Sequence, residues 1–288
     1  MKKIVGLTVA ALLVIGLVGG GTWAYFSDVE TTVDNTFTAG TLDLTRDGSS
    51  QVTTAFLTDV EVGNVAPGDS DTDLTTLANG GTLSGELDIN LGNVSEVAGT
   101  VGEFQGGTDL AGELYVALWL DKDDGGSWNA DDVGLQATAN TTYSYVAGVS
   151  GNTADSGTTT TLTDAALTEA DDYWNGFKIT LTSGTMTGLE GVVTDFDAAS
   201  DTLTVTAFRS AISTETYDLD GPLYATMSSY HNLGNYDNVL TMAIDASPGD
   251  DWDFVVEWLI PATVGNAIQG DEAQFDSIMF TLEQAAAD

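Results

Sequence analysis

Short runs rich in Val, Leu, Thr, Tyr, Phe and Trp recur along most of this chain, several of them alternate apolar with polar residues, and they predict strands. Such runs occur at 40–44, 81–91, 114–120, 238–244, 252–259 and 273–284. In the last run, Ile278, Phe280 and Leu282 fall on one face, as the two-residue period of a strand requires. Clusters of Gly, Asn, Asp, Ser and Thr separate the runs, and few segments show a helical period. The pattern therefore predicts an all-β sandwich.

The first 24 residues have the pattern of a cleavable signal peptide. Lys2 and Lys3 precede an apolar run over 4–18, and the following Gly-Gly-Gly-Thr-Trp segment leads to the small residue Ala24. The apolar run is shorter than the ~20 residues that a membrane-spanning helix needs, which disfavours a permanent anchor. We predict cleavage by a signal peptidase between Ala24 and Tyr25, and hence a secreted protein.

The charge of the chain excludes several classes of partner. The chain has 44 acidic and six basic residues, and two of the bases precede the predicted cleavage site, so the remainder carries a formal charge of −40. A phosphate backbone or an anionic lipid surface would be repelled, and nucleic acid is not an expected partner. Hydrophobic residues make up 42% of the chain, enough to form a core. There is no cysteine, so stability has to come from burial, metal or assembly.

The densest acidic segment, residues 121–132, follows a predicted strand and has the register of a calcium-binding loop. Carboxylates occupy its first, third and twelfth positions, glycine its sixth and asparagine its ninth. Glycine replaces the usual ligand at the fifth position, and the last carboxylate is the shorter Asp. The predicted Ca²⁺ ligands are Asp121, Asp123, Ser127, Asn129 and Asp132. The alternative is a solvated acidic hairpin.

Catalysis has little support in this sequence. His231 is the only histidine, and neither a nucleophile elbow nor a zinc-protease helix is present. We therefore expect no enzyme, and an acidic exported hydrolase is the weakest hypothesis. The acids at 250, 251 and 253 are expected in solvated turns. Five tryptophans could form a sugar-binding platform, but their apolar strand contexts favour core or interface positions.

Residues 150–220 differ from the rest of the chain in their sequence motifs and are predicted to be an inserted small β domain. They contain Asp171-Asp172-Tyr173-Trp174-Asn175-Gly176, then Ile179-Thr180-Leu181-Thr182-Ser183-Gly184-Thr185 and Thr194-Asp195-Phe196-Asp197. These motifs resemble a small all-β module found in phage tail and fibre proteins. The predicted organisation is a signal peptide (1–24), a sandwich (25–149 and 221–288) and the insert between its two parts. A long decorated loop is the alternative.

Three separated segments resemble the TasA/camelysin family of exported, fibre-forming matrix proteins, which includes archaeal bundling pilins. They are residues 19–28 followed by 37–44, the Pro-Gly-Asp turn at 67–69 with 77–83, and 266–271 leading to the last strand. The resemblance implies a jelly-roll-type β-sandwich, a dedicated signal peptidase and assembly into filaments.

Residues 25–37 form a Thr/Val-rich segment without an obvious pairing partner nearby in the sequence. After cleavage, this arm could complete the sheet of another copy, with Phe26, Val29, Val33 and Phe37 filling apolar pockets. Head-to-tail donation that does not close produces a filament. The alternative is an arm that folds back as the first strand of its own sandwich.

The leading hypothesis is therefore a structural subunit of extracellular filaments or pili at the cell surface, which polymerises by donor-strand complementation. It would support a biofilm matrix or cell bundling, with other copies of itself as partners and neighbouring filaments or surface glycans as further contacts. The alternative is a monomeric surface adhesin or S-layer-associated binding module.

Overall fold

The computed structural model describes residues 40–50, 65–97, 110–122, 126–244, 250–265, 268 and 271–284. Within these ranges the chain is almost entirely β, which confirms the predicted fold class. The predicted signal peptide, its cleavage site at Ala24 and Tyr25, and the arm at 25–37 lie outside the described residues.

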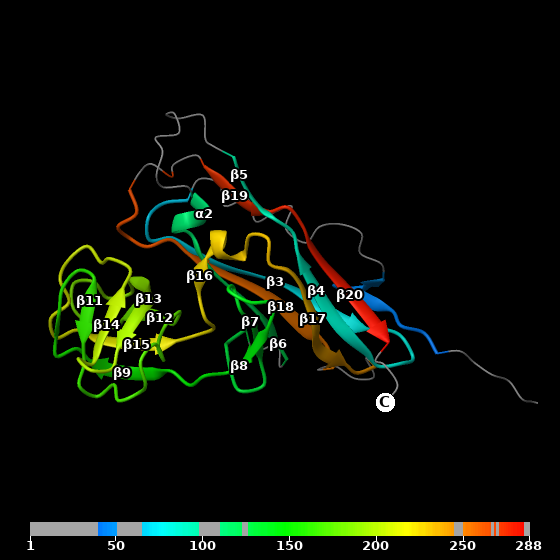
Figure 1. The fold of residues 1–288 in the computed structure, drawn as a ribbon, viewed down its shortest axis with the longest axis horizontal. Coiled ribbons are helices and arrows are strands. Elements are labelled where there is room, and N and C mark those ends of the chain that lie inside the picture. The colour runs from blue at the N-terminus through cyan, green and yellow to red at the C-terminus, as the bar shows by residue number, and fades with distance from the viewer. Residues whose placement is uncertain are drawn as a thin grey trace, which may run out of the picture. The chain divides into compact units, whose positions relative to one another are not determined.

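One face of the sandwich is an eight-stranded antiparallel sheet with the order β2-β1-β3-β18-β6-β7-β8, to which β16 adds beside β6 (Figure 1). Strand β18 lies at its centre and pairs with β3 along eight residues and with β6 along seven. The strands are β1 (Leu44–Arg46), β2 (Ser49–Ser50), β3 (Ser70–Asn79), β6 (Tyr115–Asp121), β7 (Val133–Leu135), β8 (Thr142–Ser144), β16 (Ala225–Thr226) and β18 (Trp252–Leu259).

The opposite face is a three-stranded sheet of β17 (Gly234–Met242), β4 (Gly85–Leu91) and β20 (Ile278–Gln284). A two-stranded sheet of β5 (Val94–Val97) and β19 (Glu272–Phe275) continues the pairing of β4 with β20. The predicted strand at 273–284 is therefore two strands. The break falls at Asp276 and Ser277, because the ladder shifts there: Gly92 N–H donates to Ser277 O, and Asp276 N–H donates to Asn93 O.

Two predicted strands begin later than the sequence pattern indicated. β1 begins at Leu44 and β4 at Gly85, whereas the pattern placed their starts at 40 and 81. The reason is a loop contact, since the N–H groups of Thr82 and Leu83 both donate to Thr41 O. These bonds connect residue 41 to the β3–β4 loop in place of a regular ladder.

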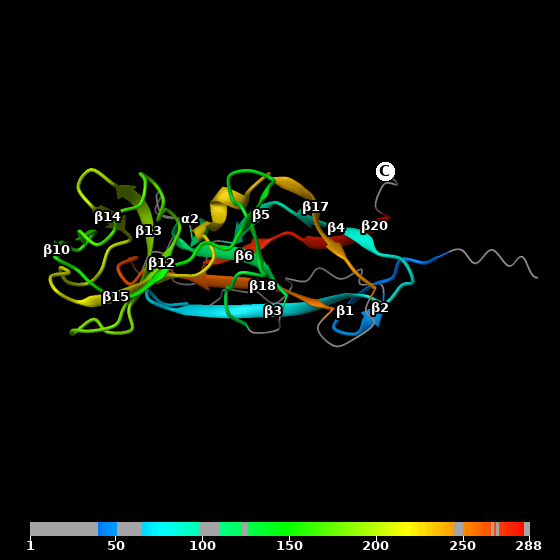
Figure 2. The ribbon, with the colours of Figure 1, turned by 90° about the horizontal axis from the view of Figure 1, so that it is seen from below.

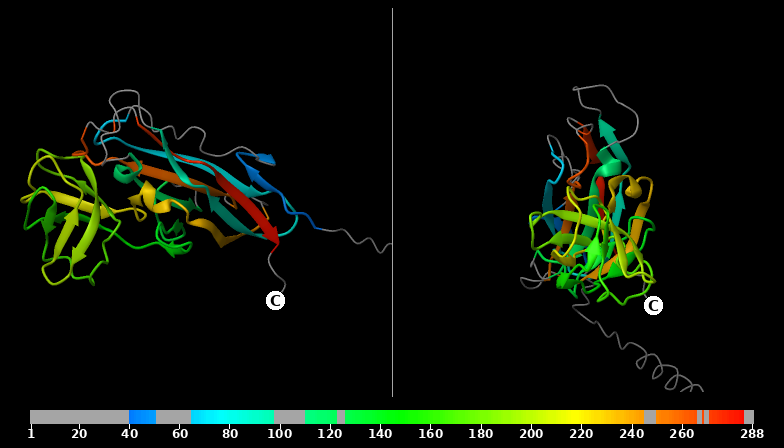
Figure 3. Two further views of the ribbon diagram at one scale, coloured as in Figure 1. Left: turned by 45° about the horizontal axis from the view of Figure 1, so that its top comes forward. Right: turned by 90° about the vertical axis from the view of Figure 1, so that its left-hand side faces the viewer.

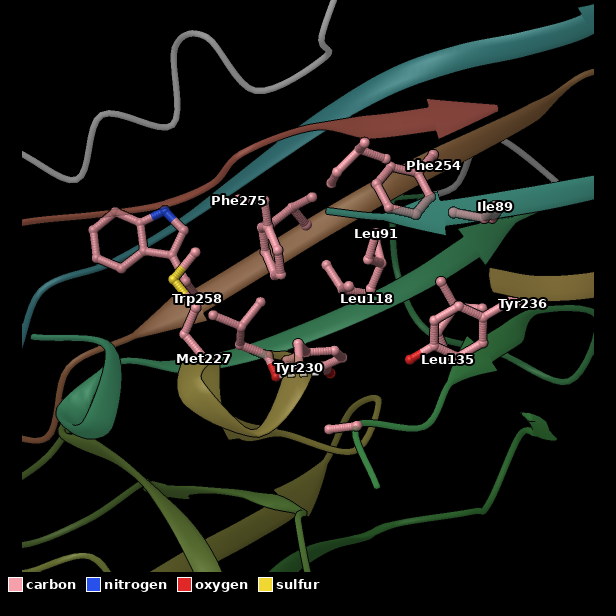
Figure 4. Close-up of a cluster of buried hydrophobic side chains, with 14 of the residues drawn as sticks. Ile89, Leu91, Leu118, Leu135, Met227, Tyr230, Tyr236, Phe254, Trp258 and Phe275 are labelled. Carbon is pink, nitrogen blue, oxygen red and sulfur yellow. Dashed lines mark hydrogen bonds between the residues drawn. The ribbon is translucent and has the colours of Figure 1, made fainter. Parts of the chain in front are cut away.

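Side chains from both sheets form one hydrophobic core (Figure 4). The alternation read from the sequence explains it, since Leu87, Ile89 and Leu91 of β4 face Phe254 and Val256 of β18 across the interior. A short helix, α2 (Leu110–Glu113), and a 3₁₀ turn, η1 (Met227–Tyr230), add Leu110, Met227 and Tyr230 to the same core.

The segment between β8 and β16 forms a separate seven-stranded sheet with the order β10-β11-β14-β13-β12-β15-β9 (Figure 2). It has its own core, which includes Trp174, Phe177 and Tyr217. The strands are β9 (Val149–Thr153), β10 (Ser156–Gly157), β11 (Thr161–Thr163), β12 (Lys178–Leu181), β13 (Glu190–Asp197), β14 (Thr202–Val205) and β15 (Thr216–Asp220). We call this segment the inserted module.

Candidate functional site

The acidic loop predicted to bind calcium connects β6 to β7. Asp121, the last residue of β6, is fully buried, and its Oδ2 accepts the Gly126 N–H at 2.7 Å. Gly126 has a φ of 62°, a left-handed conformation that glycine adopts without strain. This sharp turn falls at the sixth position, where a calcium loop requires glycine.

The far end of the loop is held by Asp132, which is 2% exposed. Its Oδ2 accepts the Asn129 N–H at 2.6 Å, and its Oδ1 accepts the Lys122 N–H at 3.2 Å. Asn129 Oδ1 in turn accepts the Asp131 N–H at 3.0 Å. The structure therefore brings the first and last predicted ligands into one hydrogen-bonded turn. Ser127 is exposed on this turn, and Asp123 lies outside the described residues.

Sequence reasoning missed Asp253 as a neighbour of this loop. Asp253 lies directly opposite Asp121 in the pairing of β18 with β6, and it is only 6% exposed. Its Oδ1 accepts the Thr76 hydroxyl at 2.6 Å. The expectation of a solvated turn at this residue is wrong, because β18 begins one residue earlier and carries Asp253 into the sheet. Like charges directly opposite each other in a sheet are destabilising.

Aromatic side chains flank the loop. Trp119 of β6 meets Trp128 edge-on with ring centroids 5.5 Å apart, and Trp128 also contacts Tyr143 and Tyr145. Gly134 allows this packing, since a Cβ there would lie 2.0 Å from the Tyr143 ring. Burial raises the pKa of Tyr143, whose hydroxyl oxygen accepts the Leu223 N–H at 2.7 Å. The rings thus pack on one another, as the core or interface interpretation predicts.

A charged cluster joins the inserted module to the eight-stranded sheet. Lys178 Nζ of β12 lies 2.7 Å from Glu257 Oε1 of β18 and 3.9 Å from Glu190 Oε1 of β13. Burial disfavours the charge on Lys178, yet Glu257, Glu190 and Asp220 outweigh it and hold its pKa above the usual 10.5. A small apolar cluster lies at the same junction and consists of Tyr115, Ala117, Val192, Tyr224 and Leu259.

Fold and composition together define an acidic all-β sandwich protein in which the inserted module, a separate seven-stranded sheet, lies between two strands of the sandwich in the sequence. The chain belongs to the camelysin metallo-endopeptidase family, whose model matches residues 1–168. It is also 42% identical over 85 residues to the "Major biofilm matrix component" of Bacillus subtilis (strain 168). That match covers 29% of this chain and 30% of the relative, so under a third of the relative's length is spanned. The family predicted from three motifs is confirmed.

The family description names a metallo-endopeptidase, and the described donor residues do not fit a hydrolytic zinc site. Such a site takes about three protein ligands from His, Cys, Asp and Glu. In the described ranges no group of three or more of these side chains is placed to hold a metal. His231 is exposed after η1, and its Nδ1 lies 3.2 Å from the Val94 nitrogen and 3.1 Å from the Val94 carbonyl oxygen. We derive no hydrolytic step from this arrangement.

The described part of the chain contains no helix that is long and apolar enough to cross a bilayer.

Proposed function

We propose that this protein is a structural subunit of an extracellular filament in a biofilm matrix. The family and the printed name of the Bacillus subtilis relative support the matrix role. Signal-peptidase processing and secretion follow from the pattern of residues 1–24. The extreme acidity is compatible with this role, because a matrix subunit need not contact nucleic acid or anionic lipid.

Assembly would occur by donation of residues 25–37 of each copy to a sheet of the next. The observation that carries this proposal is the difference in strand number between the two main sheets of the sandwich. One sheet has eight strands, and the sheet opposite it has three. A smaller sheet over a shared core is the kind of fold that an added strand completes through main-chain hydrogen bonds. Because donor and acceptor are different surfaces, the contact is heterologous, and it produces a filament when the rotation between copies does not close a ring.

The experiment is deletion of residues 25–36 followed by negative-stain microscopy of the secreted protein. We expect filaments from the unaltered chain and folded monomers from the deletion variant. A matched control replaces Thr32 and Thr36 with serine, which leaves the apolar positions of the arm intact and should preserve filaments. N-terminal sequencing checks that the leader is removed in each variant. Normal filaments from the deletion variant would refute donation.

The monomeric adhesin alternative gains little support from the tryptophans, since three of the five are buried and the other two, Trp128 and Trp252, are half-buried. Trp119, Trp174 and Trp258 are buried, so they cannot form a sugar-binding platform. The same microscopy separates the two functions, because a monomeric adhesin gives no filaments from the unaltered chain.

We also propose that residues 121–132 bind Ca²⁺. The left-handed turn at Gly126, at the sixth position of the loop, and the placement of Asp121 and Asp132 at the two ends of one hydrogen-bonded turn support this, because a calcium loop requires glycine at that position and carboxylates at its first and last positions. Bound calcium would pin the β6–β7 loop and offset part of the local negative charge.

A further inference from the structure

Strands with a neighbour on one side only are the places where another chain can add to a sheet, and folded proteins usually protect them. In the described part of the chain most such edges carry a protective feature. β2, β8 and β10 are only two or three residues long, and β5 has four. β9 and β17 are interrupted, because register shifts break their pairing with β15 and β4.

The long strand β3 is protected by charge. β1 covers only its last three residues, Leu77–Asn79, and β18 pairs along its other side. Asp71 and Asp73 lie directly opposite Trp258 and Val256, two core residues, and therefore point to the core face of the sheet although both are exposed. Burial and then the neighbouring Asp71 raise the pKa of Asp73. Any strand laid along this edge would bring its apolar side chains against these carboxylates.

Among the described residues, nothing of this kind protects strand β20. It is seven residues long, its pairing with β4 runs without a shift, and β4 is its neighbour on one side in the three-stranded sheet (Figure 3). Its core-facing residues are Ile278, Phe280 and Leu282, opposite Leu91, Ile89 and Leu87 of β4. Ile278 is buried, whereas Phe280 and Leu282 are half-buried and pack against the core. The apolar face therefore continues to the edge of the sheet.

The backbone of β20 is also oriented so that another strand could pair with its outer side. Gly92 N–H donates to Ser277 O at 2.7 Å, and a Cβ on Gly85 would lie 2.8 Å from Glu283 O, so the backbone groups of Ser277 and Glu283 face β4. Because these groups alternate in an antiparallel ladder, those of Leu282 and Gln284 face the opposite side. The side of β20 away from β4 therefore presents the backbone N–H and C=O groups of Leu282 and Gln284, beside the half-buried Leu282 side chain.

We propose that β20 is the edge that receives the arm of a second copy, over residues 29–37. The inference rests on the proposed filament function and specifies its acceptor. In the arm, Val29, Val33 and Phe37 fall on one side of a strand, and Glu30 and Asp34 fall on the other. Nine residues extend about 30 Å, which is longer than β20. The apolar side would cover Leu282 and the core beside it, and the acids would lie on the solvent face with Thr281.

The test uses the absence of cysteine in the natural chain. Two single-cysteine proteins are mixed before assembly: one carries Thr32→Cys in the arm, and the other carries Thr281→Cys on the exposed face of β20. Parallel mixtures use Glu30→Cys and Asp34→Cys to cover other registers. The matched control replaces Thr281→Cys with Thr72→Cys, an exposed position on the outer face of β3. Mild oxidation, non-reducing gels and peptide mass spectrometry identify the linked residues.

We expect at least one arm position to give about tenfold more mixed dimer with Thr281→Cys than with Thr72→Cys, because paired strands hold two thiols at a high effective concentration. Preferential linkage to position 72 in intact filaments would overturn the β20 assignment and leave the filament function standing. A double variant with both cysteines in one chain detects fold-back: linkage only within a chain, without mixed dimers, overturns donation to β20. If the processed protein forms no filaments under any of these conditions, the proposed function fails as well.

Discussion

Lys178 of the inserted module lies with Nζ 2.7 Å from Glu257 Oε1 of strand β18, and their side chains are only 16% and 19% exposed. Lys178 is one of four basic residues that follow the predicted cleavage site. A second, Arg209, also reaches the sandwich, with Nη2 3.5 Å from Pro67 O. Two of these four basic residues therefore contact the sandwich from the inserted module.

Replacing Lys178 should lower the free energy of unfolding. Lys178→Met leaves Glu257, Glu190 and Asp220 together without their cation, and we expect a loss of about 2 kcal/mol, below the ~3–5 kcal/mol typical of a fully buried pair. Urea unfolding measures the change. Lys122→Met is the matched control, since Lys122 is exposed and its Nζ lies 5.8 Å from the Trp252 ring centroid. An equal loss in both variants would contradict the role of the Lys178 pair.

The same pair predicts a pH dependence. The pKa of Lys178 in the folded protein is raised above 10.5, so its contribution is complete below pH 10.5 and is lost as pH rises through the folded pKa. Buried tyrosines such as Tyr230, whose pKa is raised by burial, add an alkaline loss in every variant. The difference in stability between the unaltered chain and Lys178→Met should therefore shrink above pH 10.5. A constant difference up to pH 12 would argue against the ion pair.

Calcium should raise the melting temperature if the β6–β7 loop binds it. At a tenfold excess over Kd, binding contributes about 1.4 kcal/mol, or roughly 3 to 5 °C for a chain of this size. Asp121→Asn keeps an acceptor for the Gly126 N–H but removes the charge, and it should abolish the shift. Asp237→Asn, at an exposed position on β17, should retain it. Magnesium at equal concentration controls for general screening, and an equal effect of both ions would remove the site.

Removing the charges on β3 should create a second adhesive edge. We expect Asp71→Thr combined with Asp73→Val to produce irregular lateral aggregates, because the core face of this edge then becomes free of carboxylates. Light scattering at neutral pH measures the change. Thr72→Val, on the outer face of the same strand, is the control. Unchanged scattering from the double variant would show that these acids do not protect the edge.

Placing a charge at the β20 edge should have the opposite effect. Leu282→Lys puts an ammonium group on the core face and is expected to abolish filaments, with a stability loss of about 1–2 kcal/mol. Thr281→Lys places the same charge on the solvent face and should leave filaments intact. Circular dichroism verifies that both variants fold. Filaments from Leu282→Lys of normal length and number would contradict an acceptor role for β20.

The class of fold and the family can be predicted from local patterns in the amino-acid sequence. Alternation is a local property, so Ile278, Phe280 and Leu282 could be assigned to one face without knowing their partners. Turn residues and short motifs are local as well, which is why the loop at 121–132 could be located. The sequence pattern does not give the strand ends correctly, because contacts such as those of Thr41 O with the N–H groups of Thr82 and Leu83 override it.

The choice of neighbouring strands, in contrast, depends on how the whole chain folds. Pairing of β18 with β6 brings Asp253 opposite Asp121, although more than 130 residues separate them in the chain. Pairing also determines which strands remain at an edge, and so distinguishes Asp73 on β3 from Leu282 on β20. These outcomes depend on which apolar faces can be buried together across long loops, and no local period in the sequence encodes that choice.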